Sequence, residues 1–95
     1  MKVVFGPRAR RDMPWFRKYY NVVFPEGRQK ASVRIRICVE TLKANPLVGH
    51  PVDGTNLRQF VISRTPFSLV CRIDADEILV IRVRDQRSGA DDELR

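Results

Sequence analysis

In the first third of the chain, the spacing of apolar residues changes from that of a strand to that of a helix. Residues 2–6 alternate weakly and end at Gly6-Pro7, which predicts a short strand. A helical stripe at i, i+4, i+7 and i+11 follows, formed by Ala9, Met13, Phe16 and Tyr20. Pro14 lies inside this stripe, where it removes a backbone hydrogen bond. Two interpretations fit: a helix kinked at Pro14, or a helix that begins at Pro14 and is capped by Asp12.

A second helix is predicted between two proline-containing segments. Residues 21–27 contain Pro25 and Gly27 and form the connection between the helices. The helix ends at Asn45-Pro46 because the residue before a proline avoids the helical region. Its apolar stripe consists of Ala31, Ile35, Cys38 and Leu42, with Val39 beside it. Two helices joined by a short loop pack antiparallel, so we expect a helical hairpin.

From residue 59 onward the period of the pattern is two, which predicts strands. Phe60 and Ile62 alternate with their neighbours, residues 67–73 alternate in the same way, and residues 78–83 form a nearly continuous apolar run. Residues 64–66 and 74–77 have the length of hairpin connections. The order is therefore strand, helix, helix and three strands. It predicts an α+β fold, a helical hairpin packed on a small, mainly antiparallel four-stranded sheet.

Length and charge narrow the possible classes of protein. A chain of 95 residues has room for one domain, residues 1–95, of which residues 88–95 are expected to form a flexible tail. No run approaches the roughly 20 apolar residues that cross a bilayer. The net charge is +7, with eleven basic and three acidic residues in 1–45 against seven and eight in 46–95. A positive field attracts nucleic acid, an acidic protein or an anionic membrane surface. The sign of the charge alone does not distinguish these partners.

The residues that most often carry chemistry are few. Cys38 and Cys71 lack metal-ligand spacing and lie in apolar patterns typical of buried free thiols. We therefore expect the protein to reside in a reducing compartment, the cytoplasm. His50 is expected to be a loop residue rather than a general base. The sequence contains no metal-site motif, no Gly-rich phosphate loop and no nucleophile triad. No cofactor is therefore expected.

Four segments, taken together in their order and spacing, resemble the ParE branch of the RelE/ParE toxins. They read NPLVG at 45–49, LRQFVI at 57–62, RTPFSLVCRI at 64–73 and IRVRDQR at 81–87. Toxins of this kind have a helix-ending Asn-Pro followed by Gly, an Arg-containing strand, a Pro-Phe turn, a Val-Tyr-Arg strand and an Arg-rich end. The resemblance spans residues 3–87. It departs at Cys71, where Tyr is usual, and we expect a change in packing there rather than in function.

The resemblance implies a β-α-α-β-β-β fold and a role as the toxin of a type II toxin–antitoxin system. Such a toxin is expected to inhibit DNA gyrase by binding it, and to be neutralised by a cognate acidic, ParD-like antitoxin that wraps around it. Operator DNA would be bound only through the antitoxin complex. No membrane partner is implied.

Two alternatives compete with gyrase inhibition. A RelE-like, ribosome-dependent mRNA endoribonuclease needs a group that activates the 2′-hydroxyl, cations for the phosphate and a general acid. RelE-type sites supply these with Lys, Arg and a late Tyr. Here no lysine follows Lys43, no tyrosine follows Tyr20, and Ser68 stands where RelE-like chains carry Arg. Binding is therefore favoured over enzymatic activity, and a non-toxic basic nucleic-acid-binding module is the second alternative.

Candidate contact residues fall into two groups. Contacts to the target or to an anion are predicted at Arg58, Arg64, Arg82, Arg84 and Arg87. Contacts to the antitoxin are predicted at Trp15, Tyr19, Arg34 and Arg72. Each residue also has a structural interpretation, because the arginines can form a solvated sheet face and the aromatic residues can belong to the core.

Overall fold

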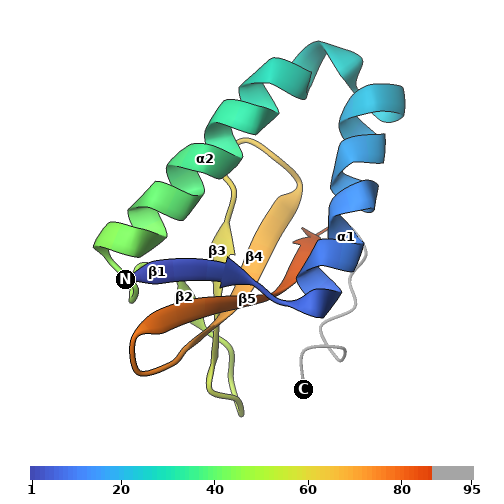
Figure 1. Cartoon of the computed structure of the whole chain (residues 1–95). Coiled ribbons are helices and arrows are strands. Elements are labelled where there is room, and N and C mark those ends of the chain that lie inside the picture. The colour runs from blue at the N-terminus through green and yellow to red at the C-terminus, as the bar shows by residue number, and fades with distance from the viewer. Residues whose placement is uncertain (87–95) are drawn as a thin grey trace.

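Two helices cover one side of a five-stranded sheet in the computed structural model, which describes residues 1–86 (Figure 1). The predicted α+β class is confirmed, with a fifth, two-residue strand that the sequence pattern did not predict. The strands are β1 (Lys2–Phe5), β2 (His50–Pro51), β3 (Leu57–Val61), β4 (Phe67–Ile73) and β5 (Glu77–Asp85). Their order in the sheet is β1-β5-β4-β3-β2. Strand β1 pairs in parallel with β5, and the other pairs are antiparallel. The expectations for Arg87 and for residues 88–95 lie outside the described residues.

Helix α1 (Pro7–Lys18) begins at the first proline of its sequence and continues through the second. Gly6 is extended and accepts a hydrogen bond from the N–H of Arg10 at 3.0 Å, while Pro7 occupies the first helical position, which suits its fixed φ. The interpretation in which Asp12 caps a helix starting at Pro14 is therefore wrong. The helix widens into a π-helical turn, Tyr19–Val23, and the N–H of Phe24 donates to Tyr19 O at 2.8 Å.

Helix α2 (Arg28–Ala44) follows a 3-10 turn, Pro25–Gly27, and buries the predicted stripe at Ala31, Cys38 and Leu42. The two helices meet at this connection and then spread apart (Figure 1). The C-terminal end of α2 lies near β1, where the amino group of Met1 donates to Lys43 O at 2.9 Å. A positive charge is favourable at the C-terminal end of a helix. No helix within residues 1–86 is long and apolar enough to cross a membrane.

The core lies between the helices and the sheet. At one end it is aromatic: the ring of Phe16 is 5.2 Å from that of Tyr20 and 4.9 Å from that of Phe67. The remainder is largely aliphatic and includes Leu42, Ile62, Leu69, Ile78 and Val80. Both cysteines are free and buried in this core, as the pattern predicted.

A β-bulge in β5 sets which side chains face the helices. Val70 of β4 lies opposite Arg82, whereas the next residue, Cys71, lies opposite Val80, so Ile81 is an extra residue in β5. Val83 consequently joins the core, and Arg82 lies with Val70 on the other face of the sheet. Gly49 allows a second close approach, because a Cβ there would lie 2.9 Å from Gln59 O of β3. This contact explains the glycine of the NPLVG segment.

Candidate partner-binding surfaces

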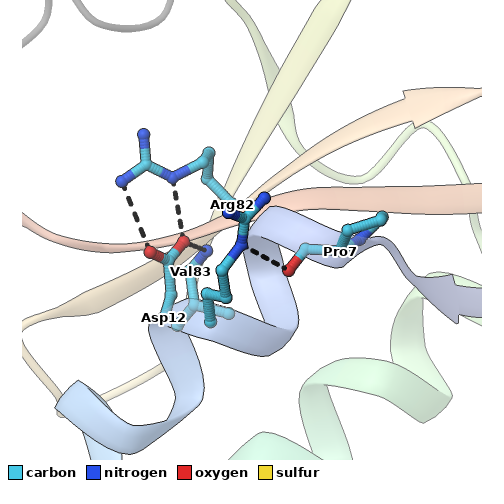
Figure 2. Close-up of polar contacts among 5 residues, drawn as sticks. Pro7, Asp12, Arg82 and Val83 are labelled. Carbon is cyan, nitrogen blue, oxygen red and sulfur yellow. Dashed lines mark hydrogen bonds and ion pairs between the residues drawn. The ribbon is translucent and has the colours of Figure 1, made fainter.

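Arg82 is held inside the molecule by Asp12 of α1 (Figure 2). The Oδ2 atom of Asp12 accepts hydrogen bonds from Nε of Arg82 and from the N–H of Val83, both at 2.9 Å, and Oδ1 accepts from Nη2 of Arg82 at 3.4 Å. The two side chains are only 17% and 15% exposed. Because β1 pairs with β5 no further than Val80, the carboxylate satisfies an N–H beyond the paired edge. Arg82, a predicted target contact, therefore joins α1 to β5.

Arg58, another predicted target contact, binds the chain itself. Its Nη2 atom donates to the carbonyl oxygens of Leu47 and Gly49, at 2.9 and 2.6 Å. These carbonyls belong to the loop that follows α2. In the register of the sheet Arg58 lies opposite Cys71, whose side chain belongs to the core. The guanidinium thus fixes this loop against the helix-covered side of the sheet.

The face of the sheet turned away from the helices carries polar side chains. Gln59 Nε2 donates to Ser68 Oγ at 2.7 Å, and Arg84 lies opposite the fully buried Ser68 with only 6% of its own surface exposed. His50 lies in β2, in register with Gln59, and not in a loop as predicted. Adjacent strands are about 4.8 Å apart, which places His50 roughly 14 Å from Arg82. His50 and Arg82 are therefore too far apart to serve as general acid and cation at one site.

Two of the predicted antitoxin contacts line an aromatic hollow of about 290 Å³. Trp15 and Tyr19 are one helical turn apart and line it together with Lys18, Val23, Phe67 and Asp85. Trp15 is 63% exposed, and the Nζ atom of Lys18 lies 5.4 Å from its ring centroid. Tyr19 packs edge-on against Phe67, at 5.5 Å between centroids. The hollow has an apolar floor and one charge of each sign at its rim.

A second surface brings together arginines that the sequence analysis placed in different groups. Arg34 and Arg64 line one hollow of about 210 Å³ between the start of α2 and the turn that joins β3 to β4. Arg34 also lines two further hollows, one with Val33 and Ile37 and one with Ile37, Phe60 and Val61. We call these three adjoining hollows the α2 groove. Trp15 and Tyr19 do not line it.

A sequence model of the family described as "ParE toxin of type II toxin-antitoxin system, parDE" matches residues 3–89. The chain belongs to this family. A solved structure from the chromosomal ParDE TA system of P. aeruginosa is similar to it, with a TM-score of 0.71 and 27% sequence identity, over 90% of this chain and 95% of that chain. No curated protein matches the chain. The resemblance to ParE toxins is thereby confirmed.

Two features of this ParE toxin concern residues named from the sequence. Arg72, a predicted antitoxin contact, forms an ion pair with Asp74 at 3.0 Å near the end of β4, and both side chains are more than one third exposed. Arg72 lines neither the aromatic hollow nor the α2 groove. Cys71, where Tyr is usual, is buried. Burial raises the pKa of its thiol to about 12, with a further contribution from Cys38. Within residues 1–86 no three His, Cys, Asp or Glu side chains are grouped closely enough to hold a metal ion.

Sequence reasoning missed the apolar residues of the α2 groove. Val33 and Ile37 are 49% and 59% exposed, and they lie four residues apart, outside the buried stripe of α2. Their spacing is a second, shorter apolar stripe on the same helix. That second stripe was the available signal, since large exposed apolar residues that lie together mark interaction sites.

Proposed function

We propose that this ParE toxin acts by binding DNA gyrase, and that a cognate acidic antitoxin neutralises it. The first part rests on the family, and on the outer sheet face, where Arg82 and Arg84 are largely covered by the protein itself and neither lies open to hold a phosphate as a ribonuclease site requires. Arginine binds anions well but stays protonated, so it moves no protons near neutral pH. Such a face is poorly suited to metal-free RNA cleavage, which needs a proton donor and acceptor at one phosphate, so an activity by binding is the better supported one.

The proposed neutralisation by an antitoxin is supported by the family and by the aromatic hollow. The similar structure from P. aeruginosa is described as a ParDE TA system, and we infer the same kind of partnership here. The hollow lined by Trp15 and Tyr19 has the apolar floor and exposed indole that commonly receive a side chain of a protein partner. Operator DNA would then be reached only through the antitoxin complex.

A supercoiling assay tests the proposed target. Purified toxin is added in increasing amounts to DNA gyrase and relaxed plasmid, and we expect supercoiling to be lost as the toxin approaches molar excess. Toxin premixed with its antitoxin is the control and should leave supercoiling intact. Unchanged supercoiling at large excess would reject gyrase as the target. Toxin-dependent cuts in an mRNA undergoing translation would instead support the ribonuclease alternative.

A further inference from the structure

The outward side of α1 carries positive charges that the protein itself does not neutralise. Arg8, Arg11 and Lys18 are exposed, and their helical spacing places them on one face of α1. Asp12 is the only acidic residue of this helix, and it is bound to Arg82 of the sheet. In the part of the chain that the structure describes, none of the three cations takes part in an ion pair. At 1.5 Å per residue they form a cationic row about 15 Å long.

An exposed aromatic side chain lies within this row. Trp15 is seven residues after Arg8 and three before Lys18, so it shares their face of α1, and it is 63% exposed. It also lines the aromatic hollow, to which Tyr19 and Phe67 contribute two further rings. The Nζ atom of Lys18 lies 5.4 Å from the centre of the indole ring, within the range of a cation–π contact. Flat apolar surface and positive charge therefore adjoin each other along α1.

A single-stranded nucleic acid has the chemistry that fits this surface. Such strands are bound by cations that follow the phosphates and by aromatic rings on which the bases stack. The hollow, about 290 Å³, lies just below the usual range of small-molecule sites, about 300 to 1,000 Å³, and suits one base rather than a base pair. A duplex, whose bases are already stacked, would satisfy the cations alone. The row contains no aliphatic side chain, which distinguishes it from the α2 groove.

We propose that α1 and the aromatic hollow bind single-stranded DNA. One base stacks on Trp15 in the hollow, and the phosphates on either side of it bind Lys18 and the pair formed by Arg8 and Arg11. The choice of DNA over RNA rests on the proposed function, because gyrase acts on DNA. Operator DNA is a duplex and is not the ligand of this site. An antitoxin side chain in the hollow would exclude the base, so the antitoxin should displace the strand.

The test is the affinity of the unaltered chain for a short fluorescein-labelled DNA strand of mixed sequence, measured by fluorescence anisotropy. The logarithm of the affinity should fall with the logarithm of the salt concentration with a slope of about −2, since three cations would each release a counterion. Arg8→Glu/Arg11→Glu should bind at least about tenfold more weakly. Trp15→Ala should also lose about tenfold, whereas Trp15→Phe, which keeps a ring, should stay within about threefold.

The matched control is Lys30→Glu/Arg36→Glu. It makes the same change in net charge at two exposed residues of α2 that lie outside the row. At about 0.15 M salt, charges more than about 8 Å from the strand are largely screened, so this variant should stay within about threefold of the unaltered chain. All the substituted side chains are exposed, and circular dichroism verifies that each variant is folded.

The fluorescence of Trp15 reports on the hollow directly, because it is the only tryptophan of the chain. A stacked base should quench it, whereas a duplex of the same sequence should bind more weakly and leave it unchanged. Absence of binding, tighter binding to the duplex, or equal losses in the control and in Arg8→Glu/Arg11→Glu would overturn the site. Tighter binding to RNA of the same sequence would overturn DNA as its ligand. These measurements contain no gyrase, so failure of the supercoiling assay and failure of this site are separate results.

Discussion

Asp12 shows how a single carboxylate stabilises the junction between a helix and a strand. It accepts hydrogen bonds from the guanidinium of Arg82 and from the N–H of Val83, in surroundings where both charged side chains are mostly covered. Removing the carboxylate takes one acceptor from a largely covered cation and the side-chain acceptor from the N–H of Val83. The cost of such a change exceeds the worth of the pair itself, because the remaining charge stays desolvated.

We therefore expect Asp12→Ala to lower the free energy of unfolding by about 3 kcal/mol. Asp12→Asn, which keeps an acceptor for Val83, should lose less. Urea unfolding followed by circular dichroism measures both. Asp53→Ala, in an exposed turn, is the control and should change stability by less than about 0.5 kcal/mol. A loss of under about 1 kcal/mol for Asp12→Ala would mean that the junction does not depend on this carboxylate.

The two core cysteines give the fold a specific sensitivity to alkaline pH. Burial raises the pKa of the Cys38 thiol from 9.0 to about 12, and that of Cys71 likewise, with Cys38 adding to the second. The folded chain thus holds these protons more tightly than the unfolded chain does. The stability they contribute is complete below pH 9 and is lost as the pH rises from there to about 12.

Between about pH 8 and about pH 10.5 we expect the unaltered chain to lose on the order of 2 kcal/mol per thiol. The double variant Cys38→Ala/Cys71→Ala is less stable at pH 8 because it leaves small cavities, but it lacks this part of the decline. Urea unfolding at the two pH values compares the slopes. Parallel slopes for the two proteins would contradict the expectation.

Among the elements, α1 shows where sequence reasoning succeeds and where it stops. Its apolar stripe predicted the packed face, and Phe16 and Tyr20 are buried. The stripe could not decide where the helix begins, since Asp12 before Pro14 has the local features of a cap. The deciding contact is with Arg82, which is 70 residues away in sequence. A long-range partner outweighed the local preference.

The sheet and the candidate surfaces likewise contain some features that the sequence predicted and others that it could not predict. Alternation predicted β3 and β4, and a nearly continuous apolar run predicted β5. Neither pattern predicted β2, which has only two residues, or the bulge at Ile81, two residues before the N–H that Asp12 binds. Helical spacing alone placed Trp15 beside Tyr19. It could not place Arg64 beside Arg34, because their proximity depends on how α2 crosses the end of β3. Arg58 and Arg82 were candidates by charge, and long-range contacts gave them structural roles.

At the scale of the whole molecule, the positive charge is concentrated in the helical layer. Exposed basic residues occur along α1 and α2, and they include Arg8, Arg17, Lys18, Arg28, Lys30 and Arg36. Two more, Arg10 and Arg11, donate from their Nε atoms to the backbone carbonyl oxygens of Phe5, at the end of β1, and Pro7, at the start of α1. The α2 groove opens within this layer, so an acidic partner would approach it through a favourable field.

This arrangement makes the rate of association with the antitoxin, more than the rate of dissociation, depend on salt. Long-range attraction between net charges is screened beyond about 10 Å at 0.1 M salt, whereas charge pairs covered in a complex are screened much less. The association rate constant should therefore fall at least about tenfold between about 0.05 M and about 0.5 M sodium chloride. The dissociation rate constant should change by less than about threefold, because the apolar contacts that a partner would make with exposed side chains such as Ile37 and Trp15 are insensitive to salt. Stopped-flow fluorescence of Trp15 follows association directly, since it is the only tryptophan of the chain. An association rate that is the same at both salt concentrations would show that the charge of the helical layer does not guide the partner.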